Sequence, residues 1–168
     1  MLLGALLSAA PVFSQAMADP HIKGGQFVWF TLSESRAELT TALGRPAVVA
    51  DFGHDFVSWQ YQLGNIDHHD FSHQVVMRRD GAIVSITRNY EPERNVDALF
   101  PENETTTHEY AVDGKPQFSV RVRRLSGGRL LLAMGVSKPG QKTYQLMLIR
   151  ESEVRYFHPW LAEQLRKS

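Results

Sequence analysis

The chain has 168 residues, of which 43% are hydrophobic and 21% charged, the composition of about one ordinary globular domain. Lys and Arg total 18 and Asp and Glu total 18, so the chain lacks the basic excess that is usual in nucleic-acid-binding proteins. Cysteine is absent, which excludes disulfides, thiol chemistry and anchoring through a lipid-modified cysteine.

The start of the chain is an uncharged apolar segment. Met1–Ala18 contains no Asp, Glu, Lys or Arg, and it ends in Ala16-Met17-Ala18, the small-x-small pattern that signal peptidase cleaves. The usual Lys or Arg before the apolar run is missing, and an uncleaved anchor or a buried first helix are the alternatives. We predict a signal peptide at 1–18, a flexible leader at 19–26 and a single domain at 27–168. The mature protein would then be periplasmic or secreted, with no membrane span after cleavage.

A short helix is predicted next. Thr31-Leu32-Ser33-Glu34 has the spacing of a capping box, in which the first and fourth residues satisfy each other's backbone amides. Leucines recur on one helical face, at Leu32, Leu39 and Leu43. Gly44 suits the end of a helix, and Pro46 prevents its continuation. The pattern predicts a helix at about 33–43.

Strands and hairpins follow. Val57, Trp59, Tyr61 and Leu63 alternate with Ser58, Gln60 and Gln62, which is typical of a half-buried strand. Asp80-Gly81 is a favoured hairpin turn. A two-residue turn there would place Met77 opposite Val84 and Val75 opposite Ile86 on one face, with Gln74 and Thr87 on the other.

The second half predicts another meander. A three-residue turn at Asp113-Gly114-Lys115 would gather apolar side chains on one face by three pairings: Tyr110 with Phe118, His108 with Val120, and Val112 with Pro116. Leu130–Met134 is apolar enough for a central strand, and a turn at Pro139-Gly140 leads to a strand at 144–149.

Pro159 suits the first turn of a closing helix at about 159–167, in which Leu161 and Leu165 share a face. Successive hairpins without parallel crossovers indicate the α+β class, an antiparallel meander sheet with an N-terminal and a C-terminal helix. The alternative is an unrelated helix-sheet-helix sandwich.

The segment from Phe27 to Tyr90 resembles the BamE/SmpA-type and β-lactamase-inhibitor-protein-like envelope domains. The residues that carry the resemblance are Thr31–Glu34, Leu43-Gly44-Arg45-Pro46 and Trp59-Gln60-Tyr61. In those domains a short helix ends in a Leu-Gly-x-Pro turn and a sheet opens with a Trp-x-Tyr strand. The resemblance implies binding to another envelope protein without catalysis or cofactor. BamE-type proteins carry a lipidated cysteine, which this chain lacks.

The candidate chemistry lies in a histidine-rich stretch. Four of the seven histidines, His54, His68, His69 and His73, lie between positions 54 and 73, together with Asp55, Asp67 and Asp70. Imidazole and carboxylate groups are ligands for Zn²⁺ and similar ions. The favoured interpretation is a solvated loop whose side chains stabilise turns. A metal site, a small hydrolase site and a pH sensor are the alternatives.

Arg121 and Arg123 alternate with Val120 and Val122, so both should project from one sheet face, and Arg78 joins them if the two meanders share a sheet. This is either a charged solvent face or a surface that binds an anion or a partner. No nucleotide loop or Gly-x-Ser-x-Gly elbow is present. We therefore expect an exported soluble protein that acts by non-catalytic binding, with no cofactor, no catalytic residues and no metal site.

Overall fold

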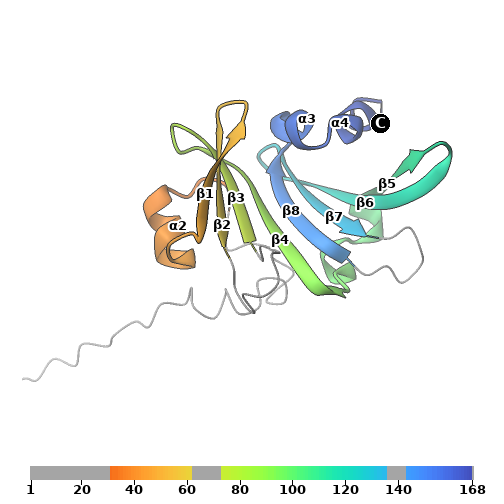
Figure 1. Ribbon diagram of the computed structural model, residues 1–168. Helices are drawn as coiled ribbons and strands as arrows, with labels where there is room; N and C mark the ends of the chain where they lie inside the picture. The colour runs from red at the N-terminus through yellow and green to blue at the C-terminus, as the bar shows by residue number, and fades with distance from the viewer. Residues whose placement is uncertain (1–30, 62–72, 136–142, 168) are drawn as a thin grey trace, which may run out of the picture.

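The computed structural model describes residues 31–61, 73–135 and 143–167. Eight strands form one antiparallel sheet in the order β1-β2-β3-β4-β8-β7-β6-β5 (Figure 1). The predicted signal peptide, the leader, Leu63 and the Pro139-Gly140 turn lie outside these ranges. The strands are β1 (Val48–Gly53), β2 (Phe56–Tyr61), β3 (His73–Arg78), β4 (Ile83–Arg94), β5 (Thr105–Val112), β6 (Lys115–Leu125), β7 (Arg129–Gly135) and β8 (Thr143–Arg150).

Two meanders share this sheet. The chain lays down β1 to β4 in order and then crosses to the far edge through two short 3₁₀ turns, η1 (Asp97–Leu99) and η2 (Glu102–Glu104). It returns as β5 to β8, so that β8 pairs with β4. The apolar strand β7 lies between β6 and β8, in the interior that its composition predicts.

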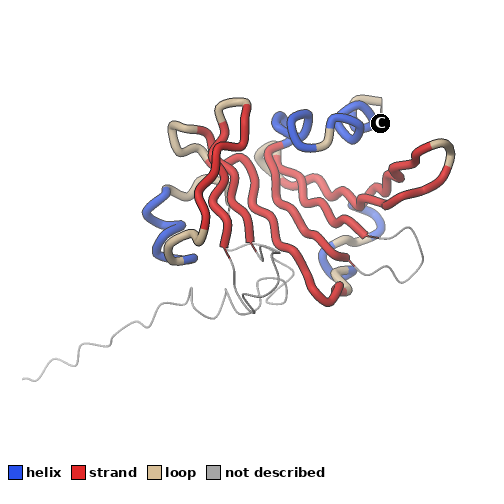
Figure 2. Tube along the Cα trace, viewed as in Figure 1, coloured by secondary structure: helices blue, strands red, loops and turns tan. Residues whose placement is uncertain are grey.

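The expected α+β class is wrong, because the sheet dominates the molecule. Strand accounts for 53% of the structure and helix for 23% (Figure 2). Three α-helices are described: α2 (Arg36–Leu43), α3 (Val154–Phe157) and α4 (Pro159–Leu165), and a 3₁₀ turn, η3 (Glu151–Glu153), precedes α3. They are too short to form a helical layer. None of the helices in the described ranges is long and apolar enough to cross a membrane.

The N-terminal helix begins later than predicted. The backbone N–H of Thr31 does donate to Glu34, at 2.6 Å. However, Leu32 has a φ of 66°, a left-handed conformation that a helix cannot include. The capping box that starts the helix is the next one along the chain, between Ser35 and Glu38. The helix therefore begins at Arg36 instead of Ser33.

The first hairpin has the predicted faces and a different turn. Val75 lies opposite Ile86 and Gln74 opposite Thr87, as predicted. Met77 lies opposite Ile83 and not Val84, because the backbone N–H of Arg78 bonds to the carbonyl of Ala82 across a three-residue turn. A bulge at Val84 absorbs the extra residue, and the predicted Met77–Val84 pair is wrong.

The second hairpin shows the reverse change. His108 pairs with Val120 and Tyr110 with Phe118, as predicted. Val112 pairs with Lys115 and not with Pro116, since the turn contains only Asp113 and Gly114, with φ of 50° and 72°. The predicted Val112–Pro116 pair is therefore wrong.

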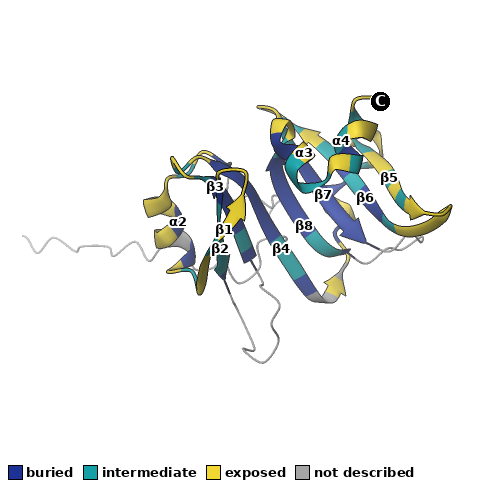
Figure 3. Ribbon diagram, turned by 45° about the horizontal axis from the view of Figure 1, so that its top comes forward, coloured by how far each residue is buried: buried dark blue, intermediate teal, exposed yellow. Residues whose placement is uncertain are grey.

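Each face of the sheet carries its own core. One, here called the α2 face, packs strand residues such as Val75, Met77, Leu131 and Leu148 against Leu32, Leu39 and Leu43. The other, here called the α4 face, packs residues such as Val76, Val122, Leu130 and Ile149 with Val154 and Leu161. Burial is concentrated on the central strands, while β1 and the β5–β6 hairpin are exposed (Figure 3).

Candidate functional site

The predicted histidine cluster is not brought together in the described residues. His73 is only 3% exposed and lies on β3 opposite Tyr61 and Arg88. An Arg88 guanidinium nitrogen is 2.9 Å from Nδ1 of His73. Burial, together with the charge of Arg88, lowers the pKa of His73 to about 3. The ring is therefore neutral and accepts a hydrogen bond from Arg88.

His54 lies far from His73. It occupies the exposed turn before Phe56, at one end of β2, while His73 pairs with Tyr61 at the other end. Five residue steps along a strand span about 17 Å, so the two rings cannot bind one metal ion. His68, His69, Asp67 and Asp70 lie outside the described residues. In the ranges that are described, no three or more metal-ligating side chains are grouped to hold an ion.

The arginines predicted on one face are engaged in ion pairs. Arg121 binds Asp97 and lies 4.9 Å from the ring centre of Phe100. Its hydrogen bond holds the pKa of Asp97 below the ordinary value. Arg123 binds Glu104 and the carbonyl of Leu99. Both guanidinium groups thus fasten the η1–η2 connection to the sheet, which is a structural role.

Arg78 does not join these two arginines, although the two meanders do share one sheet. It follows Met77 of the α2 face and therefore projects from the α4 face. There it binds Glu153 at 2.8 Å and lies 5.2 Å from the ring centre of Phe56. The hydrogen bond with Glu153 and its negative charge raise the pKa of Arg78.

The most unusual surface is the outer edge of β1. Three of the four exposed large hydrophobic side chains of the described residues lie there: Val48 at 42%, Val49 at 59% and Phe52 at 41% exposure. β1 pairs with β2 on one side, and no described strand lies on its other side. An edge strand presents unpaired backbone N–H and C=O groups, so this edge is an open site for another strand.

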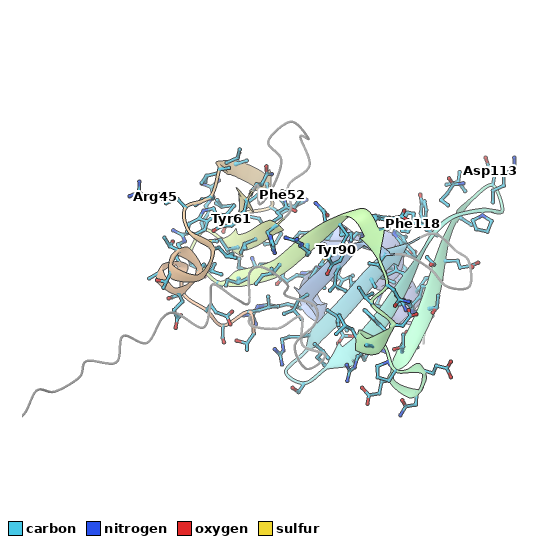
Figure 4. The ribbon with its side chains drawn as sticks, turned by 90° about the horizontal axis from the view of Figure 1, so that it is seen from below. Arg45, Phe52, Tyr61, Tyr90, Asp113 and Phe118 are labelled. Atoms are coloured by element: carbon cyan, nitrogen blue, oxygen red, sulfur yellow. The ribbon has the colours of Figure 1, made fainter. Side chains whose placement is uncertain are left out.

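An aromatic patch continues this edge onto α3. Phe52 stacks on Phe157 with ring centres 5.6 Å apart, and His54 lies 5.1 Å from Tyr156. The guanidinium of Arg155 lies 4.8 Å from the ring centre of Tyr156. Exposed aromatic and arginine side chains are the residues most enriched at the centres of protein interfaces. Figure 4 places Phe52 and Arg45 on this side of the molecule and Asp113 at the far hairpin tip.

The only charged side chain on β1 is held in an ion pair. Asp51 binds Arg79 at 2.6 Å, and Asp55 in the following turn binds the same guanidinium at 2.9 Å. The sequence Val48-Val49-Ala50-Asp51-Phe52-Gly53 contains neither Lys nor Pro, the residues that commonly protect an edge strand.

The opposite edge of the sheet has a different character. β5 begins with three threonines and carries a charged Glu109. α4 packs beside it, with Trp160 at 5.2 Å from Tyr110 and Gln164 bonded to His108 at 3.0 Å. Only Val112, beside the hairpin turn, is an exposed large apolar residue there. Among the described strands, an edge rich in exposed apolar side chains is therefore specific to β1.

Strand β1 was not predicted from the sequence. Its residues show no apolar-polar alternation, because both of its faces are largely exposed. The available signal was the β-branched pair Val48-Val49 between Pro46 and the Gly53-His54-Asp55 turn.

No protein-family model matches the chain, and no curated protein matches it. The solved structures that are similar to it include the following two. One is a cysteine-rich secretory protein from Staphylococcus aureus, with 14% identity and a TM-score of 0.44 over 72% of this chain and 45% of that one, so this chain spans less than half of that protein. The other is a DUF4309 family protein from Bacillus subtilis, with 12% identity and a TM-score of 0.41 over 70% of this chain and 79% of that one. At these TM-scores neither match assigns a function. Neither is a BamE-type domain or a β-lactamase inhibitor protein, so the resemblance of the N-terminal half to those domains stays a prediction.

Proposed function

We propose that this protein is exported and acts as a non-catalytic binding protein, which holds another polypeptide by pairing an extended strand with the edge of β1. The observation that carries the proposal is the concentration of exposed apolar side chains on this one edge strand. In such strand addition, backbone hydrogen bonds supply affinity and alternate side chains supply specificity.

The surroundings of β1 support this proposal. Monomeric proteins rarely leave an apolar edge strand open, because it pairs readily with other chains, and the bulge of β1 lies at its end, at Phe52. Asp51 could discourage such pairing, yet its carboxylate is held by Arg79. The exposed ring of Phe52 next to Phe157 offers an aromatic anchor at one end of the same edge.

The proposal of export rests on the apolar start of the sequence and on Ala16-Met17-Ala18. When the full chain is produced in a bacterial host, N-terminal sequencing of the periplasmic or secreted fraction should begin at Asp19. Recovery of only the uncut chain from the cytosol would contradict export.

The binding edge is tested by affinity capture from a bacterial cell envelope extract with the purified protein. Val48→Lys should abolish capture, because it places a hydrated charge on the pairing edge. Val112→Lys is the matched control, since Val112 is exposed to 46% and Val48 to 42% and both lie on edge strands. Equal capture by both variants would refute the proposed binding edge.

A further inference from the structure

We infer that the strand added to β1 is the β1 strand of a second copy of this chain, paired antiparallel about a two-fold axis at Ala50. This inference rests on the proposed function and names the partner of the same edge.

Successive residues from Val48 to Asp51 point to opposite faces of the sheet, and a bulge at Phe52 follows them. Val49 lies opposite Trp59, which packs against the core of the α2 face. Val48 and Ala50 lie opposite Gln60 and Ser58 and so point to the α4 face. Phe52 shares that face, where it stacks on Phe157.

A two-fold axis perpendicular to the sheet keeps each face continuous across the interface. In an antiparallel pair, residues directly opposite each other point to the same face. The axis must therefore lie midway between the two copies of one residue. Val48, Ala50 and Phe52 of one copy then lie opposite residues of this same set in the other copy. The candidate centres within the strand are Val49, Ala50 and Asp51.

The side chains favour Ala50 as the centre. Val48 of each copy then lies opposite Phe52 of the other, which gives two aromatic–β-branched pairs around a small Ala50–Ala50 contact. A centre at Asp51 would place two carboxylates directly opposite each other. A centre at Val49 would place Phe52 opposite Pro46, beyond the paired strand. The Ala50 register pairs the residues from Val48 to Phe52, with Val49 opposite Asp51 and with Phe52 at the bulge that β1 forms against β2.

The charges at the two ends of β1 agree with an antiparallel partner. Arg45 is exposed just before the strand, and Figure 4 shows it pointing away from the molecule. At the other end two carboxylates, of Asp51 and Asp55, share the single guanidinium of Arg79 and leave a net negative charge. Antiparallel pairing brings each Arg45 toward the acidic end of the other copy, which is favourable.

The pairing also limits the assembly to two copies. The same surface is used by both copies, so the interface is isologous and ends at a dimer. The second edge, β5, is mostly polar, and it offers no apolar strand for further growth.

The absence of cysteine allows a direct test of the register. Opposed residues of antiparallel strands have Cα atoms about 4.5–5.5 Å apart, within the range that a disulfide bridges. Ala50→Cys should therefore form a disulfide-linked dimer under mild oxidation at least about tenfold faster than Val112→Cys, whose thiols meet only by collision. Circular dichroism of both variants establishes that each is folded.

Sedimentation equilibrium completes the test. The wild-type chain should show a dimer fraction that rises with concentration, and Val48→Lys should be monomeric at the same concentrations. A wild-type monomer throughout, or equal oxidation rates for the two cysteine variants, overturns the inference. If the wild-type chain is a monomer but captures an envelope protein that Val48→Lys does not, the partner is a different protein and the proposed function stands. If neither self-association nor capture depends on Val48, the proposed function fails as well.

Discussion

At the scale of single residues, the surroundings of each side chain decide its chemistry more than its residue type does. His73 lies in a histidine-rich stretch, yet it is a buried neutral base that accepts a hydrogen bond from Arg88. Arg78, Arg121 and Arg123 look alike in the sequence, and all three are bound to carboxylates in the fold. Which carboxylate each one meets depends on pairings distant in the sequence, which no local pattern contains.

The buried His73 predicts a loss of stability in mild acid. Its pKa in the folded chain, about 3, lies below the unfolded value of 6.5, so protons bind preferentially to the unfolded chain. The stabilisation is complete above pH 6.5 and is lost as the pH falls toward 3, by about 1.4 kcal/mol per pH unit. The variant His73→Gln keeps an acceptor for Arg88 but does not titrate. Urea unfolding at pH 7 and at pH 5 should show that the free energy of unfolding falls by about 2 kcal/mol less in this variant than in wild type. Equal losses in both proteins would contradict this assignment.

The ion pair between Arg78 and Glu153 predicts a second effect on stability. Glu153 is 8% exposed, so Arg78→Ala leaves a nearly buried carboxylate without its cation. We expect a loss of about 1–3 kcal/mol in the free energy of unfolding, because Arg78 itself is partly exposed and solvent screens the pair. Arg124→Ala is the control, since the side chains of Arg124 and Glu151 are 48% and 42% exposed and it should cost under about 0.5 kcal/mol. Similar losses in the two variants would refute a special role for the Arg78 pair.

At the scale of elements, the sequence predicts strand faces better than turns. Val75–Ile86 and Tyr110–Phe118 pair as expected, because a shift by one residue would turn the apolar set of each strand into solvent. The turns are one residue longer and one residue shorter than predicted. Bulges at Val84 and Gln117 absorb the difference, since a bulge changes the local geometry without exchanging the faces beyond it.

Strand β1 and the start of α2 show what local patterns cannot predict. β1 is exposed on both faces and so carries no periodicity. The two capping-box spacings, Thr31–Glu34 and Ser35–Glu38, follow each other directly and are equivalent as sequence patterns. The left-handed conformation of the buried Leu32 excludes the first of them, and this depends on packing against the sheet.

The helices α3 and α4 predict a specific response to mutation, because they hold the two outer hairpins of the sheet. Phe157 stacks on Phe52 and Phe56 of the β1–β2 hairpin, while Trp160 contacts Tyr110 and Phe118 of the β5–β6 hairpin. Trp160→Ala should cost about 2–3 kcal/mol, since the ring is only partly buried. It should accelerate hydrogen exchange in β5 and β6 and spare β1 and β2.

Phe157→Ala is the matched variant for this test, and it should show the opposite distribution of exchange. If both variants accelerate exchange in the same strands, α3 and α4 do not act separately on the two hairpins.

At the scale of the whole molecule, the pairing of β4 with β8 makes one body of two meanders. Alternating side chains of β7 show this directly, since Leu131 and Ala133 belong to the core of the α2 face and Leu130, Leu132 and Met134 to that of the α4 face. The two cores therefore share their strands. Neither meander can lose its packing without exposing residues that the other one covers.

This sharing predicts a single cooperative unfolding transition. Leu39 packs on the α2 face and Leu161 on the α4 face, and both side chains are 0% exposed. Leu39→Ala and Leu161→Ala should each lower the free energy of unfolding by about 2–5 kcal/mol with the slope against urea unchanged. In wild type and both variants, tryptophan fluorescence and far-ultraviolet circular dichroism should give superimposable curves, because Trp59 lies in the first meander and Trp160, on α4, packs on the second. Separate transitions, with Leu39→Ala shifting only one of them, would show that the meanders unfold independently despite their common sheet.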